Sequence, residues 1–189
     1  MRIVLILFAS LLLPGALVAS PEEGMPSLRA WSEDIAGQQN WQVRPLPNGL
    51  MAFANQRGIA LFDGERFEQV DGPGGIIYDF CAGPDQRIYL ATGRALGYLQ
   101  PSERREWQFV PLPLPAGAPP PGDIGRVVAA HGRVFFLSRS LLLSHHPRSG
   151  WRWRASTSFY ADLRLRDDRL LLYEEGSGWL QYDPAREDF

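Results

Sequence analysis

Short apolar runs separated by polar turns dominate the chain after residue 40, and the same order of runs and turns recurs four times. In each copy a polar dipeptide comes directly before a strongly apolar run. The dipeptides are Asn48-Gly49, Asp85-Gln86, His131-Gly132 and Asp168-Arg169, and the last three begin 37, 83 and 120 residues after the first. Such pairs favour the tight turns that join antiparallel strands, because their residues tolerate a positive φ. The pattern therefore predicts repeated antiparallel hairpins.

Each copy predicts four strands. The second strands are residues 50–53, 87–90, 133–136 and 170–173, and the third strands are residues 58–62, 96–99, 141–144 and 178–182. A first strand precedes the polar dipeptide in each copy. A second turn, at Asp63-Gly64, Gln100-Pro101, His146-Pro147 or Asp183-Pro184, leads to a short aromatic fourth strand. The fourth strands are marked by Phe67, by Trp107 and Phe109, by Trp151 and Trp153, and by Phe189.

Four short antiparallel strands in a repeat of about 40 residues are typical of a propeller blade. The sequence predicts an all-β fold, a partial β-propeller of about four blades of four antiparallel strands over residues 41–189. The copies span about 41–75, 76–113, 123–157 and 158–189. Residues 111–122 contain six prolines and predict a stiff extended connector between copies two and three. A polyproline ligand for a partner domain is the alternative interpretation of that segment.

The first nineteen residues have the pattern of a secretory signal peptide. Arg2 precedes an apolar run over residues 3–19, and the run ends in the small residues Ala19 and Ser20. We predict a signal helix over residues 1–19, removed after Ala19, a lead-in over residues 20–40, and an exported, periplasmic protein. The alternative is an N-terminal membrane anchor with the protein facing the periplasm, because the apolar run is near the shortest length that spans a bilayer of about 30 Å.

Composition and charge exclude several classes of function. All 19 basic residues are Arg, so a Schiff-base lysine and a P-loop lysine are excluded. The net charge of −2 comes from scattered residues, which gives no basic patch for nucleic acid. The lone Cys81 can form no internal disulfide and no thiolate metal cluster, and its apolar neighbours favour a buried, unreactive thiol.

The first copy also contains Asn55, Gly58-Ile59, Asp63-Gly64 and Phe67. With these residues, segment 41–70 resembles the first repeat of the two-component regulator propellers, and segment 86–99 is similar to the next blade of that family. The structural repeat positions are Asn55, Gly58, Asp63, Gly64, Phe67, Gly97, Trp107, Trp153, Gly178 and Trp179. Copy three departs from the pattern, because Leu141 stands where the other third strands have a glycine at or next to the start.

The resemblance implies the periplasmic sensing half of a membrane receptor. In that family the propeller has about seven blades, followed by a β-sandwich, a membrane helix and a histidine kinase or a cyclic-dinucleotide-type output domain. Four blades then form part of a ring and leave two apolar sheet faces without a neighbour. We expect self-association or a complementing chain to close the propeller, or a chain that is the front part of a longer, truncated gene.

Candidate site residues are few. Ligands of propellers gather where loops from several blades converge, and Arg57, Arg94 and Arg139 fall between the second and third strands of three copies. These arginines are the candidate ligand-binding residues, and solvent-facing turn arginines are the alternative. No catalytic residue and no metal site is predicted, since the adjacent His145 and His146 would point to opposite faces of a strand.

Other motifs receive structural interpretations. His131, His145 and His146 are interpreted as turn histidines, and the pairs Asp167-Asp168 and Glu174-Glu175 as solvated turn carboxylates. Segment 151–154, Trp-Arg-Trp-Arg, is interpreted as a strand with one buried aromatic face and one hydrated arginine face rather than a nucleic-acid platform.

The predicted function is a non-catalytic extracytoplasmic module that senses or binds an unknown small molecule or protein, with no cofactor and no nucleic acid. The alternatives are a periplasmic propeller enzyme, a lyase or hydrolase, and a structural scaffold or truncated remnant. A cluster of histidines and acids on one face would favour the enzyme, and the sequence shows none.

Overall fold

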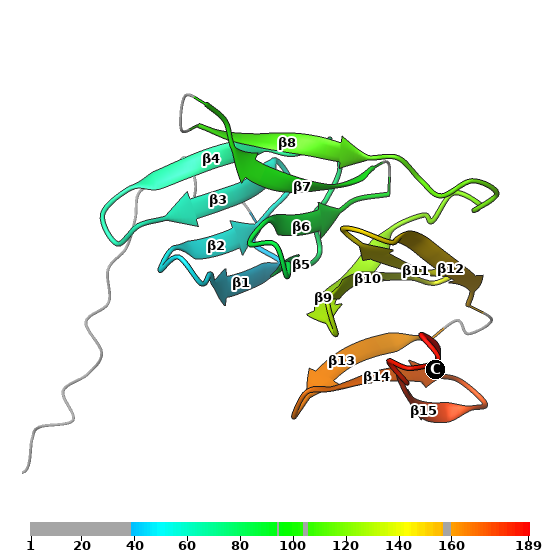
Figure 1. The fold of residues 1–189 in the computed structure, drawn as a ribbon. Helices are drawn as coiled ribbons and strands as arrows, with labels where there is room; N and C mark the ends of the chain where they lie inside the picture. Colours follow the sequence, from blue (N-terminus) through cyan, green and yellow to red (C-terminus); the bar gives the residue numbers. More distant parts are fainter. Residues whose placement is uncertain (1–38, 94, 104–105, 157–159) are drawn as a thin grey trace, which may run out of the picture. The chain divides into compact units, whose positions relative to one another are not determined.

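The computed structural model describes residues 39–93, 95–103, 106–156 and 160–189, and these contain fifteen β-strands in four antiparallel sheets. In every sheet the spatial order of the strands follows the chain order, and the sheets succeed one another along the chain (Figure 1). This arrangement confirms the predicted all-β propeller of four blades. The predicted signal helix, residues 20–38 of the predicted lead-in, and Arg94 lie outside the described residues.

Three blades have four strands and the fourth blade has three in the described residues. Blade one contains β1 (Gln42–Pro45), β2 (Met51–Ala54), β3 (Gly58–Phe62) and β4 (Phe67–Asp71). Blade two contains β5 (Phe80–Ala82), β6 (Ile88–Ala91), β7 (Leu96–Pro101) and β8 (Trp107–Leu112). Blade three contains β9 (Ile124–Ala130), β10 (Arg133–Ser138), β11 (Leu141–His146) and β12 (Gly150–Ala155). Blade four contains β13 (Asp162–Arg166), β14 (Arg169–Glu174) and β15 (Gly178–Gln181).

Three local predictions were wrong. Phe189 does not mark a strand: residues 183–189 form a turn closed by a bridge between Asp183 and Asp188, and the Phe189 ring packs 5.3 Å from the ring of Tyr182. The hairpin turn of blade four is Asp167-Asp168, with φ of 49° and 61°, so that Arg169 already begins β14. Gln100 and Pro101 lie inside β7, because the pairing of β7 with β8 extends beyond the apolar run.

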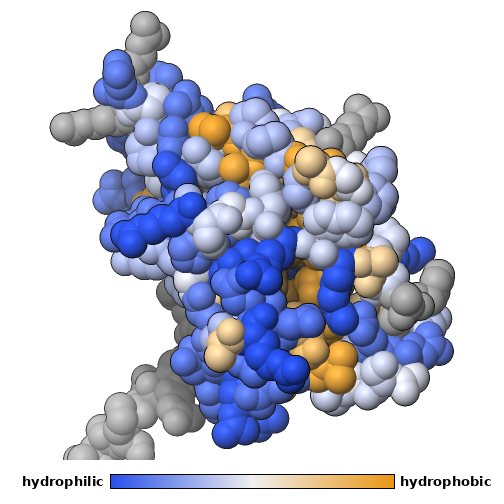
Figure 2. All heavy atoms as spheres, turned by 45° about the vertical axis from the view of Figure 1, so that its right-hand side comes forward, coloured by the Kyte–Doolittle hydropathy of each residue, from blue (hydrophilic) through white to orange (hydrophobic). Residues whose placement is uncertain are grey.

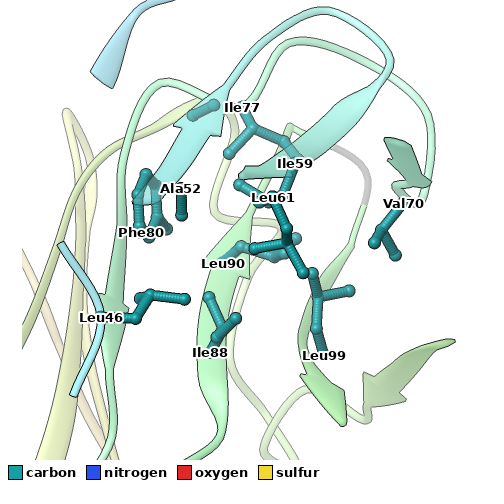
Figure 3. Packing of buried hydrophobic residues seen from close by; sticks show 11 residues of the cluster. Leu46, Ala52, Ile59, Leu61, Val70, Ile77, Phe80, Ile88, Leu90 and Leu99 are labelled. Atoms are coloured by element: carbon teal, nitrogen blue, oxygen red, sulfur yellow. The ribbon is translucent and has the colours of Figure 1, made fainter. Parts of the chain in front are cut away.

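The core of the protein lies between neighbouring blades. Alternate residues of a strand point to opposite faces of its sheet, so each inner blade can bury both faces. In Figure 3, Ile59 and Leu61 of blade one lie close to Leu90 and Leu99 of blade two. Similar clusters join blade two to three and blade three to four. Each fully buried Leu or Ile contributes about 1.5–3 kcal/mol to folding, so these interfaces hold the blades together.

The first and last sheets each have a face that no sheet of the described residues covers. On blade one, Val43 pairs in register with Phe53, opposite the face that carries Ile59, and Val43 is 45% exposed. On blade four, Tyr173 pairs with Trp179, which is 49% exposed. On the side of the molecule shown in Figure 2, hydrophilic residues surround separate apolar patches. No helix in the described part of the chain has the length and hydropathy to span a bilayer.

A buried polar residue recurs where the second strand of a blade ends. Asn55 Oδ1 accepts hydrogen bonds from the backbone N–H of Arg57 (2.9 Å) and of Gly58 (3.0 Å). Ser138 Oγ accepts from the N–H groups of Ser140 (3.3 Å) and Leu141 (3.1 Å) in the same way. Thr92 Oγ1 accepts from the N–H of Ala95 at 3.3 Å. These side chains accept hydrogen bonds from backbone N–H groups of the turn that have no partner in a neighbouring strand. They therefore hold the second and third strands together.

The other repeat positions support strands and turns. Gly58 has a φ of 154°, and a Cβ there would overlap the carbonyl oxygen of Val70, so only glycine fits. Asp63 Oδ1 accepts from the N–H groups of Arg66 (2.7 Å) and Glu65 (2.8 Å), and these bonds hold the pKa of this exposed carboxyl below its usual range. Gly64 has a positive φ in the same turn, and Phe67 stacks on Phe62. The remaining repeat positions lie in the third or fourth strand of a blade: Gly97, Trp107, Trp153, Gly178 and Trp179.

Asn55→Ala is expected to lower the free energy of unfolding by about 2 kcal/mol, because the buried N–H of Gly58 and the partly buried N–H of Arg57 lose their acceptor. Urea denaturation checks this value. Asp63→Ala is the matched control: it removes an acceptor from two amides in an exposed turn, where water replaces it, and its effect is expected to be much smaller. Equal losses in the two variants would contradict the role assigned to burial.

Candidate ligand-binding site

The first strands of the four blades, β1, β5, β9 and β13, together line a hollow of about 930 Å³, here named the inner-strand hollow. Each strand contributes at least one ionisable side chain to it or to its immediate edge. Arg44 comes from β1, Asp79 precedes β5, Arg126 comes from β9 and Arg164 from β13. Because antiparallel blades repeat the same strand order, residues far apart in sequence meet here.

Asp79 connects three blades. Its carboxylate is 1% exposed and accepts four hydrogen bonds. Oδ1 accepts from Arg44 Nη2 (2.8 Å), from Gln42 Nε2 (3.2 Å) and from its neighbour's N–H at Phe80 (2.9 Å). Oδ2 accepts from the N–H of Val127 in β9 at 3.0 Å. A buried carboxylate is tolerated only when its oxygens accept hydrogen bonds. The main role of Asp79 is therefore to hold blades one, two and three together.

Asp162 makes a second, more open joint between blades three and four. Its Oδ1 accepts from Arg126 Nε (2.8 Å), and its Oδ2 accepts from Arg164 Nε (2.7 Å). Partial burial alone would raise the pKa of the Asp162 carboxyl, but the hydrogen bonds from the two arginines outweigh it and hold that pKa below its ordinary value. The carboxylate is therefore charged at neutral pH and orients both guanidinium groups.

Positive charge exceeds negative charge in this hollow. The exposed fractions of the arginine side chains are 38% for Arg44, 49% for Arg126 and 66% for Arg164. At the edge of the hollow, the rings of Trp41 and Tyr78 meet edge to face with centroids 5.3 Å apart. Cys81 also lines the hollow, but burial raises the pKa of its thiol and keeps it neutral. The arrangement can bind an anion and offers no activated nucleophile at Cys81.

Two of the three arginines predicted from the sequence lie in the described residues, and their surroundings differ. Arg57 lies in the turn between β2 and β3, with Nη2 3.8 Å from Asp71 Oδ1 of the same sheet. Arg139 lies in the turn between β10 and β11 and lines a hollow of about 640 Å³. Tyr78 and Arg126 line this second hollow as well as the inner-strand hollow. A ring formed by the three arginines stays a prediction.

The three histidines lie in a hairpin turn or in strand β11, and their contacts support the fold. His131 adopts a φ of 49° in its hairpin turn, and His146 Nδ1 accepts from the N–H groups of Arg148 and Ser149. The turn interpretation was wrong for His145 and His146, which both lie in β11. His145 lies beside the ring of Trp151, and partial burial lowers its pKa. No group of three or more His, Cys, Asp or Glu side chains among the described residues is placed to hold a metal ion.

Two structural interpretations of polar motifs were wrong. Glu174 is not a solvated turn carboxylate: it is buried, and its Oε2 accepts from Arg154 Nη2 at 2.9 Å across the interface of blades three and four. Strand β12 consequently has no simple division into a buried aromatic face and a hydrated arginine face. Trp153 is 41% exposed, while Arg152 and Arg154 both form ion pairs with residues that follow β13.

The inner-strand residues were missed because the first strand of each copy was predicted without residues assigned to it. A signal was present: Arg44 and Arg164 are separated by 120 residues, which is the offset of copy four. Asp162 is the first residue of β13 and Arg126 the third of β9, and a polar residue near the start of a strand resembles part of the preceding turn. Pairing between Arg126 and Asp162 depends on how two blades pack, and the sequence of either strand alone does not contain it.

Comparisons with known proteins give similarity at the level of the fold. No protein-family model matches this sequence, and no curated protein matches it. Two crystal structures of the extracellular domain of BT4673 from B. thetaiotaomicron match, one described as a putative one component system and the other as a putative hybrid two component system. Each has a TM-score of 0.58 and 13% identity, and the match covers 80% of this chain and 21% of the other.

The matched segment is therefore about a fifth of the length of those extracellular domains. The fold-level match agrees with the resemblance of the first two copies to the two-component regulator propellers. At 13% identity the match shows the fold alone: four antiparallel blades that superpose on part of the extracellular domain of BT4673.

Acid is expected to destabilise the protein partly through Asp162. The pKa of this carboxyl is lower in the folded protein than in the unfolded chain, so its stabilising effect is complete above the unfolded value of about 3.9 and is lost as the pH falls through the folded-state value. Asp162→Asn should therefore show a smaller loss of stability between pH 6 and pH 3 in urea denaturation. Asp167→Asn, at an 88% exposed carboxylate, is the control; identical pH slopes for all three proteins would contradict the prediction.

Proposed function

We propose that the protein is a non-catalytic extracytoplasmic sensing or interaction module that binds its ligand in the inner-strand hollow. One observation carries the proposal: all four blades contribute their first strand to a single hollow of about 930 Å³. That volume lies within the usual range of small-molecule sites, about 300–1,000 Å³. A site built from four blades also responds to small changes in blade packing, which suits a sensor.

The fold-level similarity to an extracellular domain of a putative hybrid two component system supports this proposal. It is also in keeping with an exported location, periplasmic after removal of the leader or facing the periplasm from an N-terminal anchor. A role without catalysis is supported by the surroundings of two carboxylates, that of Asp79 in the hollow and that of Asp162 beside it. Asp79 and Asp162 are occupied by arginines and backbone amides, so neither is positioned as a general base.

Closure of the propeller by self-association or by a complementing chain stays a prediction. The exposed apolar side chains on the outer faces of blades one and four, Val43 and Trp179 among them, support it. The same faces are expected to accept further blades if the chain continues.

A ligand screen tests the proposed function. The purified protein is heated with a library of small molecules, and a ligand present at 100 times its dissociation constant should stabilise the fold by about 2.7 kcal/mol. Hydrogen exchange should then show protection in β1, β5, β9 and β13, and mass spectrometry should recover the compound unchanged. Protection confined to other strands would contradict the site, and conversion of the compound would contradict a non-catalytic role.

A further inference from the structure

The balance of charge in the inner-strand hollow identifies the class of ligand. Three guanidinium groups, those of Arg44, Arg126 and Arg164, line the hollow together with the carboxylate of Asp79. A second carboxylate, that of Asp162, pairs with Arg126 and Arg164 beside the hollow. Both carboxylates are already saturated. Asp79 accepts four hydrogen bonds, and Asp162 accepts from two arginines and from the N–H of Leu163. The excess positive charge therefore lies on the arginines, which a ligand can reach.

The arginines keep donors for a ligand. Within the described residues, Arg164 binds Asp162 through Nε, and Arg126 uses Nε for Asp162 and Nη1 for the carbonyl of Gly125. Arginine has five N–H donors in a planar fork that matches a carboxylate. The terminal nitrogens of Arg164 and Nη2 of Arg126 remain for such a group. Asp162 orients both arginines before any ligand arrives, which reduces the entropy lost on binding.

An aromatic pair at the same hollow adds a second requirement. Trp41 is 40% exposed, and its ring meets the ring of Tyr78 edge to face. Exposed aromatic faces favour flat or apolar rings, which stack on them and displace water. The hollow thus combines a cationic side with an aromatic edge.

We propose that the inner-strand hollow binds a small organic acid that carries a carboxylate on a ring, with Arg126 and Arg164 as the carboxylate-binding residues and Trp41 and Tyr78 as the contact for the ring. This inference rests on the proposed function, because it names the ligand class of the same site. Arg44 is a positioning residue: it holds Asp79 and adds to the positive potential of the hollow.

Isothermal titration with two matched pairs of compounds tests the inference. Benzoate is compared with benzamide, and cyclohexanecarboxylate with cyclohexanecarboxamide, so that each pair differs in the charge of one group. Each acid should bind at least about tenfold more tightly than its amide, since a charge-assisted hydrogen bond contributes about 1.5–3 kcal/mol. The advantage of the acids should also shrink as sodium chloride is raised.

Variants locate the binding residues. Arg164→Gln should weaken benzoate binding about tenfold, and Trp41→Ala should weaken both acids. Arg166→Gln is the matched control, because Arg166 lies on the same strand, is 83% exposed and is not among the residues that line the hollow. It should leave binding unchanged. Thermal unfolding of each variant confirms that it is folded.

The outcomes separate this inference from the proposed function. Equal binding of acids and amides, or equal effects of Arg164→Gln and Arg166→Gln, would overturn the anionic ligand class while leaving a sensor of neutral molecules. If none of the four compounds binds, the inference is also overturned, and the separate library screen then decides whether the hollow binds any small molecule.

Discussion

Asp79→Ala is expected to lower the free energy of unfolding by about 4 kcal/mol, because it removes a buried carboxylate that accepts four hydrogen bonds and leaves the buried N–H groups of Phe80 and Val127 without an acceptor. The carboxylate is almost fully buried and accepts from donors on blades one, two and three. Its removal leaves the N–H of Val127 without this acceptor and the Arg44 guanidinium without its partner. Urea denaturation of both proteins at pH 7 measures the difference.

Two further variants make the result interpretable. Asp79→Asn keeps the shape of the side chain but places an NH₂ group among donors, so an intermediate loss is expected. Asp71→Ala removes an acid that is 78% exposed on the outer strand of blade one, and it should change stability little. If Asp79→Ala costs no more than Asp71→Ala, the inter-blade bonds do not stabilise the fold.

Arg133→Met is expected to cost about 3 kcal/mol, because a buried, fully bonded guanidinium is replaced by a side chain of similar length that donates nothing. Arg133 is 3% exposed. It donates to Ser144 Oγ (3.2 Å), to the carbonyl of Gly150 (3.3 Å) and to Glu187 Oε1 (3.2 Å). The residue therefore fastens the segment after β15 to blade three.

Local opening of the segment after β15 independently measures how firmly Arg133 holds that segment to blade three. The N–H of Asp183 donates to the carbonyl of Asp188 at 2.7 Å, and its hydrogen exchange should accelerate in Arg133→Met more than overall stability alone explains. Arg152→Met is the control: Arg152 also pairs with Glu187 but is 58% exposed, and a smaller change is expected. Equal changes in stability and exchange for the two variants would contradict a special role for the buried arginine.

The strand pattern was recognisable from the sequence because blades are built from local hairpins. Turn residues such as Gly49 and His131 adopt the positive φ that their type predicts, and the apolar strands between them are buried. Errors arose where local chemistry was ambiguous. Asp167, Asp168 and Arg169 are all polar, so the turn was placed one residue too late. Phe189 was predicted to mark a strand, but its ring packs against the ring of Phe135.

The buried side chain that accepts hydrogen bonds from the turn after the second strand shows a different limit of sequence comparison. Thr92 and Ser138 lie 37 and 83 residues after Asn55, the spacings of the repeat, and all three bind amides of the following turn. Sequence comparison identified Asn55 alone, because three different side chains perform the task. Only their shared hydrogen-bond pattern makes them equivalent.

The sequence by itself determined the all-β class, the number of blades in residues 41–189 and most of the strands, since hydrophobic alternation and turn chemistry act over a few residues. Only the tertiary structure decided which charged residues meet. Arg126 reaches Asp162, and Arg44 reaches Asp79, because neighbouring blades pack with their first strands side by side. Burial then makes Asp79 a joint between blades and leaves Arg126 and Arg164 partly exposed at the hollow. Contacts between blades depend on packing over the whole domain, which no local pattern of residues records.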